Sequence, residues 1–124
     1  MTGLLSVLEP LSVLRIACGL FFIPHVWGKL QFPPPLVEFF EQAGLKPAKA
    51  FMLLACAVEA VAATALICNL FTPAAAMLAA ANLAVATICL YRVRGFLWIW
   101  NSGGFEFPLF WGLVLLVVAR VYSA

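Results

Sequence analysis

Charge is what this sequence has least of. Its 124 residues include no aspartate, five glutamates and seven lysines and arginines, so 10% of the residues are charged. Soluble domains carry about 25% charged residues. With 66% hydrophobic residues and a mean hydropathy of +1.12, the composition excludes an ordinary soluble domain and predicts an integral membrane protein in contact with the lipid bilayer. The net charge of +2 is too small to indicate a nucleic-acid partner.

Metal-binding and dithiol motifs are also lacking. The chain has one histidine and four scattered cysteines without a C-x-x-C pair, namely Cys18, Cys56, Cys68 and Cys89. A zinc or haem site needs further ligands at suitable spacing, so we expect neither metal nor haem. We expect the four thiols to be reduced and buried, packing as small apolar side chains. The first apolar run has no basic leader and holds Arg15, which is atypical of a cleaved signal peptide.

What is present is a series of apolar stretches long enough to cross a bilayer, which takes about 20 residues. We expect an all-α fold in which residues 1–124 form one domain, a transmembrane four-helix bundle with spans at about 11–30, 49–70, 73–93 and 105–122. QFPPP at 31–35 ends the first span. Residues 36–45 (LVEFFEQAGL) are too short to cross and have phenylalanines opposite glutamates. They predict a short interfacial helix, with Gly44 as its C-cap.

The connections give further detail. NLFTP at 69–73 predicts a tight hairpin between spans two and three, and the alanines of span three indicate close helix packing, with Asn82 bonding across helices. Trp98 and Trp100 suit the headgroup level. Loops one and three share one membrane side and contain basic residues that would place that side in the cytoplasm. The orientation stays open, because these residues can instead belong to a site (Lys46, Lys49, Arg92 and Arg94).

Ionisable residues within the spans are the candidate site, since such residues are costly in a membrane and mark function. At 100° per residue, Arg15, His25 and Lys29 fall in one stripe of span one, where Pro24 loosens the helix. Glu59 lies in the middle of span two, and Glu106 opens span four. From their depths we expect Arg15 to pair with Glu59 and Lys29 to meet Glu106.

Each of these residues also has a purely structural interpretation. An Arg15–Glu59 pair can set the register of two helices without any chemistry. Glu106 can be a helix cap favoured by the helix dipole, and His25 can bond a backbone carbonyl. The functional interpretation is a polar ligand-binding cluster at the mouth formed by loop one, made of His25, Lys29, Glu106, Arg15 and Glu59.

Four motifs taken together resemble the DoxX family of small four-helix membrane proteins. They are R-x(9)-H-x(3)-K from Arg15 to Lys29, FFEQAGLKP at 39–47, the intramembrane Glu59, and GGFEFPL at 103–109. The chain departs from the family pattern after His25, where two residues precede Gly28, and at Phe107, where the family has tyrosine. The resemblance implies a redox role in a bacterial or archaeal cell membrane. The founding activity of the family is that of a thiosulfate:quinone oxidoreductase, in which the family member is a subunit. Other relatives are partners of oxidative-stress enzymes or assembly factors.

The residues and the resemblance together predict a membrane subunit of a quinone-linked oxidoreductase complex, with a quinone headgroup or small anion bound at the polar cluster. His25 and Lys29 would donate hydrogen bonds to the ligand, and Glu106 would carry a proton. Electron transfer would come from a quinone cofactor or a partner subunit, so whether the chain is itself an enzyme stays open. Partner subunits or a homo-oligomer are expected. The alternatives are a non-catalytic anchor or assembly partner and a small permease, for which the chain is short and has no inverted repeat.

Overall fold

Helices make up nearly all of the described chain. The structure is a computed structural model that describes residues 9–99 and 104–123. Within those residues it contains no strand. Its helical segments are α2 (Pro10–Leu20), α3 (Phe22–Leu30), α4 (Pro34–Gln42), α5 (Ala48–Cys68), α6 (Thr72–Arg94) and α7 (Glu106–Tyr122). The all-α prediction is confirmed.

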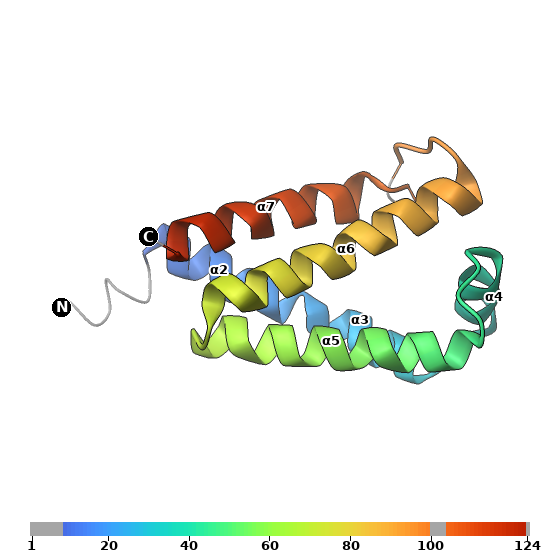
Figure 1. Ribbon diagram of the computed structural model, residues 1–124, viewed down its shortest axis with the longest axis horizontal. Coiled ribbons are helices and arrows are strands. Elements are labelled where there is room, and N and C mark those ends of the chain that lie inside the picture. The colour runs from blue at the N-terminus through green and yellow to red at the C-terminus, as the bar shows by residue number, and fades with distance from the viewer. Residues whose placement is uncertain (1–8, 100–103, 124) are drawn as a thin grey trace.

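Three stretches are long and apolar enough to cross a membrane: α2 together with α3 (Pro10–Leu30), α5 and α6. α7 has 17 residues and is therefore about 26 Å long, slightly less than the roughly 30 Å of a bilayer core. It lies beside α6, with which it makes the most extensive helix contact (Figure 1). α2 begins and α7 ends at one end of this assembly, whereas α4 lies across the other end (Figure 1). The chain is a multi-pass integral membrane protein.

The first candidate span is interrupted at Phe21, between α2 and α3. Pro24 explains the position, because it has no N–H to bond the Leu20 carbonyl and its ring crowds that carbonyl. The helix was predicted to loosen at Pro24, and the structure places the interruption one turn earlier, where the backbone bond is lost.

α4 begins at Pro34, two residues before the segment predicted from the sequence. We assigned the proline run only to the end of span one, but prolines also fit the first turn of a helix, where the missing N–H is not needed. The predicted stop at Gly44 is present one residue later than a strict C-cap, which is Ala43. Gly44 has φ 88°, and the Leu45 N–H donates to the Phe40 carbonyl at 2.9 Å. α4 then packs on the start of α5 through a cluster of Phe40, Ala48 and Met52.

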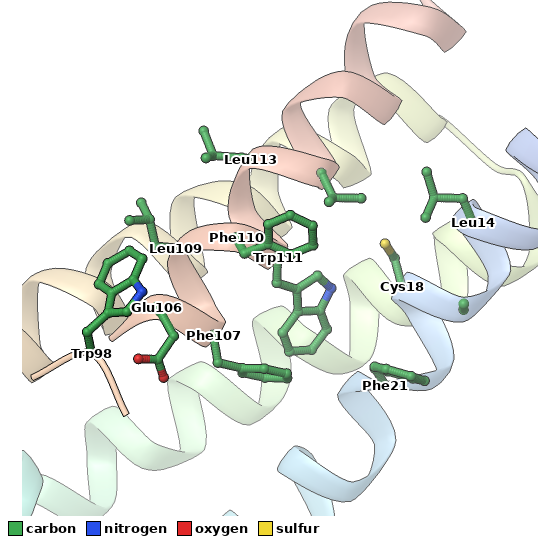
Figure 2. Close-up of a pocket in the computed structure, with 12 residues that line it drawn as sticks. Leu14, Cys18, Phe21, Trp98, Glu106, Phe107, Leu109, Phe110, Trp111 and Leu113 are labelled. Carbon is green, nitrogen blue, oxygen red and sulfur yellow. The ribbon is translucent and has the colours of Figure 1, made fainter. Parts of the chain in front are cut away.

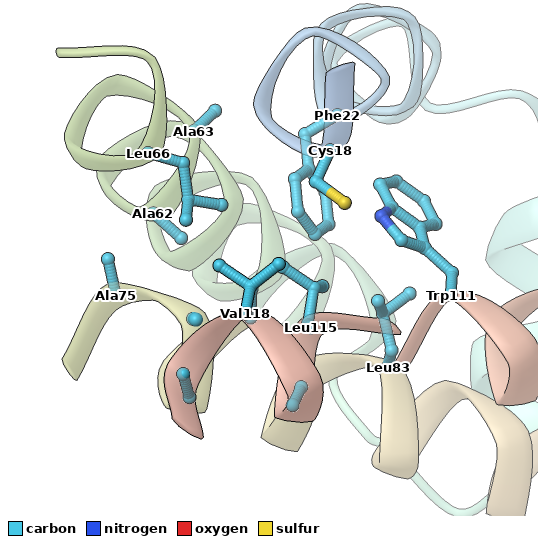
Figure 3. Packing of buried hydrophobic residues seen from close by; sticks show 14 residues of the cluster. Cys18, Phe22, Ala62, Ala63, Leu66, Ala75, Leu83, Trp111, Leu115 and Val118 are labelled. Atoms are coloured by element: carbon cyan, nitrogen blue, oxygen red, sulfur yellow. The ribbon is translucent and has the colours of Figure 1, made fainter. Parts of the chain in front are cut away.

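The predicted tight hairpin between α5 and α6 is present. Asn69 has φ 55° and ends α5, and Phe71 has φ 48° just before α6 begins. The core beyond the hairpin is built from small residues of α5 and α6 around larger side chains such as Phe22, Leu66 and Leu115 (Figure 3). Gly19 lets α2 approach α5 closely, because a Cβ there would lie 2.8 Å from Ile67 Cγ1. Close packing by small residues is how apolar helices associate inside a bilayer.

Candidate functional site

A deeply buried polar cluster joins three helices through Glu59, which is 4% exposed in the middle of α5. Lys29 Nζ, at the end of α3, lies 3.0 Å from Glu59 Oε1 and forms an ion pair with it. Asn82 Nδ2, on α6, donates to Glu59 Oε2 over 2.9 Å. Both carboxylate oxygens therefore have a partner, as a buried charge requires. The predicted bond of Asn82 across helices is confirmed.

Arg15 belongs to a different cluster. Its guanidinium donates to the Leu66 carbonyl, to the Ile67 carbonyl at 3.2 Å and to the Tyr122 hydroxyl at 3.2 Å. The last carbonyls of a helix have no partner within it and carry the negative end of its dipole. Arg15 thus supplies hydrogen-bond donors to two carbonyls in the C-terminal turn of α5 and links this turn to the end of α7.

The two ion pairs predicted from depth are therefore wrong. Arg15 does not pair with Glu59, and Lys29 pairs with Glu59 instead of Glu106. The reason lies in the reach of the basic side chains. Rise per residue places Cα atoms, but a long lysine or arginine can extend along the helix axis to a partner at another depth. Lys29 extends inward from the end of α3, and Arg15 reaches the opposite end of α5.

His25 lies on the exposed side of α3. Its imidazole stacks on Phe107 of α7, with ring centroids 6.2 Å apart and an angle of 24° between planes, and lies 5.5 Å from the Trp111 ring. The three residues of the stripe predicted on span one therefore lie in three different environments. Arg15 points into the bundle, Lys29 reaches Glu59, and His25 faces the aromatic side chains of α7.

Glu106 opens α7, as predicted, but is not a simple cap. Both of its carboxyl oxygens are buried, and neither has a hydrogen-bond partner among the residues that the structure describes. Gly104 allows this placement, because a Cβ there would lie 2.7 Å from Glu106 Oε2. Its neighbour Gly103 lies outside the described residues. A buried carboxyl without a partner is costly, so Glu106 is the residue of the predicted cluster that most clearly needs a further partner.

Glu106 lines a groove between α2 and α7, which contact each other far less than α6 and α7 do. The groove has a volume of about 620 Å³, within the range of small-molecule sites. Figure 2 shows the Glu106 carboxyl between Trp98 and Phe107, and the Trp111 indole nitrogen directed toward Cys18. We call this feature the α2–α7 groove; its lining residues are Leu14, Ala17, Cys18, Phe21, Trp98, Glu106, Phe107, Leu109, Phe110, Trp111, Leu113 and Val114.

Trp111 is the residue of this region that the sequence analysis missed. Its side chain is 7% exposed, and its indole Nε1 is buried without a hydrogen-bond partner among the described residues. The signal was the aromatic density of FEFPLFW at 105–111 directly after a charged residue in an apolar span. We had assigned that stretch only to the opening of the fourth span.

The loop-one end of the bundle is aromatic at its surface. Phe96 and Trp98 stack with an angle of 9° between their rings, and Arg94 lies over the Phe39 ring at 5.5 Å. Trp98 is 54% exposed, in keeping with a headgroup position; Trp100 lies outside the described residues. Among residues 9–99 and 104–123, no group of three metal-binding side chains is found.

The cysteines are all free, but only three of them are buried. Cys68, in the last turn of α5, is exposed, so the expectation of four buried thiols is wrong at this position. Its place beside the α5–α6 turn explains the difference, because fewer helices surround the end of a span than its middle.

Comparison with protein families identifies the chain. The model of the DoxX family matches residues 11–92, from the start of α2 almost to the end of α6 and well over half of the chain. The matched region contains Arg15, His25, Lys29 and Glu59 and ends before the GGFEFPL motif with Glu106. No curated protein and no solved structure matches the sequence. The resemblance read from the motifs is confirmed, and the chain belongs to the DoxX family.

Proposed function

We propose that this DoxX-family protein is the membrane subunit of a quinone-linked oxidoreductase, and that the α2–α7 groove binds the quinone. One observation carries the proposal: a groove of about 620 Å³, almost entirely apolar, contains the buried carboxyl of Glu106, for which the described residues supply no hydrogen-bond partner. Cofactor sites combine an apolar cavity with a few polar groups that fix orientation. A lipid-soluble ligand can enter such a groove from the bilayer without crossing water.

The architecture in this proposal is a single domain of residues 1–124 with four membrane crossings, α7 being the fourth. α7 is apolar over most of its length and packs along α6. Its shortfall of a few ångströms against the bilayer core costs little, because the bilayer can thin locally. With α7 as a crossing, the groove opens sideways toward the acyl chains.

The residues of the predicted cluster take separate roles. His25 and Glu106 lie at the seam between α3 and α7 and are the groups available to a ligand, His25 through its contact with Phe107 and Trp111. The Lys29–Glu59 ion pair joins α3 to α5, and Arg15 joins α2 to the end of α5. In this proposal these contacts hold the helices in register. A bound quinone supplies reversible two-electron, two-proton chemistry. The chain's contribution is to bind it, to exclude water and to hold a proton at the Glu106 carboxyl.

The test is the quinone content of the gently purified protein, measured by native mass spectrometry and by solvent extraction. We expect wild type to carry quinone, and Glu106→Ala and His25→Ala to lose most of it. Glu41→Ala is the matched control, because Glu41 is exposed on α4 and outside the groove. If wild type carries no quinone while a protein partner copurifies, the non-catalytic anchor or assembly role replaces this proposal.

A further inference from the structure

The α2–α7 groove contains two buried hydrogen-bonding groups for which residues 9–99 and 104–123 supply no partner at normal hydrogen-bond geometry. One is the Glu106 carboxyl and the other is the indole N–H of Trp111, whose side chain is more than nine-tenths buried. Figure 2 shows the indole nitrogen directed toward the Cys18 thiol, and the two side chains interact. Sulfur is only a weak acceptor, so the indole N–H still has no strong acceptor among the described residues. An unmade hydrogen bond in a low-dielectric site is costly. A ligand that forms hydrogen bonds with both groups would therefore be favoured.

The groove offers no cation to that ligand. None of its lining residues is lysine, arginine or histidine, and the four undescribed residues between Ile99 and Gly104 include no basic one. Two basic side chains of the neighbouring helices are engaged elsewhere, Arg15 with carbonyls of α5 and Lys29 with Glu59. His25 meets the groove only through ring contacts with Phe107 and Trp111 and is not among its lining residues. A desolvated anion placed beside a carboxyl group, with no positive charge facing it, would be strongly disfavoured.

The positions of the two groups also limit the shape of the ligand. Glu106 and Trp111 are five residues apart on α7, a rise of about 7.5 Å. Figure 2 shows the carboxyl and the indole nitrogen in different parts of the groove. A headgroup with a single oxygen could form a hydrogen bond with one of the two groups but not with the other. A flat ring with oxygens on opposite edges can reach both, and apolar residues such as Leu14 and Leu113 remain for a tail.

We infer that the groove binds an uncharged quinone or quinol, with one ring oxygen accepting a hydrogen bond from the Trp111 indole and the other sharing a hydrogen bond with the Glu106 carboxyl. This inference rests on the proposed function and narrows it. It makes Trp111 a ligand-binding residue, and it excludes a small anion as the occupant of the groove.

The experiment observes the indole N–H directly. The full chain, labelled with ¹⁵N-tryptophan and placed in lipid nanodiscs, has four indole signals, one for each tryptophan. The Trp111 signal is assigned from Trp111→Phe, or by elimination from the other three Trp→Phe variants if that variant does not fold. Decyl-ubiquinone and sodium sulfate are titrated separately. The control variant is Trp27→Phe, since Trp27 is 68% exposed on α3 and outside the groove.

We expect decyl-ubiquinone to shift the Trp111 signal and sulfate to leave it unchanged. Loss of one hydrogen bond, worth about 0.5–1.5 kcal/mol, should weaken quinone binding about two- to twelve-fold in Trp111→Phe, with no change in Trp27→Phe. Quinone binding that neither moves the Trp111 signal nor weakens in Trp111→Phe overturns the inference and leaves the proposed function standing. A Trp111 shift caused by sulfate also overturns it. If wild type binds no quinone, the proposed function fails with it.

Discussion

Replacing Lys29 by methionine should destabilise the protein far more than replacing an exposed lysine. The side chains of Lys29 and Glu59 are 14% and 5% exposed, and their ion pair measures 3.0 Å. Methionine keeps the length and apolar stem of lysine but leaves Glu59 Oε1 buried without a partner. Breaking a buried pair by removing one member costs about 3–5 kcal/mol. Lys46→Met, at an exposed position before α5, should cost within about 0.5 kcal/mol.

The double variant Lys29→Met/Glu59→Leu tests whether the lost stability comes from the unpaired charge or from altered packing. It removes both charges together, so no group is left uncompensated, and replacing a whole buried pair by apolar side chains is often neutral or stabilising. We expect most of the lost stability to return, which corresponds to a coupling energy of several kcal/mol. Asn82→Leu removes a single interhelical hydrogen bond and should cost only about 0.6–1.7 kcal/mol.

The free energy of unfolding can be measured by titrating the purified protein with sodium dodecyl sulfate in mixed micelles and following helix content by circular dichroism. The reasoning is refuted if Lys29→Met costs no more than Lys46→Met. It is also refuted if the Lys29 and Glu59 substitutions are additive, because the two side chains would then not interact in the folded protein.

Three further predictions use the same preparation. Arg15→Lys, which loses the fork that joins the end of α5 to Tyr122, should cost about 1–3 kcal/mol in the same titration, and a cost near zero would argue against this bridge. Gly19→Ala should cost about 1–3 kcal/mol because its Cβ would meet α5, whereas Gly28→Ala, which meets nothing within 4 Å, should be neutral or slightly stabilising. Maleimide should label Cys68 alone in the folded protein, and mass spectrometry showing more than one label per chain would contradict the burial of Cys18, Cys56 and Cys89.

The helices could be predicted well because their signals are local. Long apolar stretches and their breaks gave the three candidate spans to within about two residues. The stop at Gly44 and the turn after Cys68 follow from residues that accept unusual backbone conformations, and the structure has positive φ at Gly44 and Asn69. None of these features depends on which helix lies next to which.

The pairing of helices could not be predicted in the same way. In water, an apolar face identifies the side of a helix that is buried. In a membrane, lipid and protein interior are both apolar, so large apolar residues such as Val61 and Ile88 are more than half exposed while alanines of the same helices are buried. The sequence pattern therefore did not give the rotation of the helices, and without it neither the partner of Lys29 nor the α2–α7 groove could be located.

The position of the groove follows from where the polar links are made. Arg15 ties α2 to the ends of α5 and α7, Lys29 ties α3 to α5, and Asn82 ties α6 to α5 through Glu59. At the seam between α3 and the first turns of α7, the contacts given by the described residues are between rings, among them His25 on Phe107 and Phe22 on Trp111. Ring contacts of this kind contribute about 0.5–1.5 kcal/mol each, much less than breaking the buried ion pair would cost. This seam is accordingly held more weakly than the helix pairs joined by polar links, and under the proposed function it is where a lipid-soluble ligand would enter.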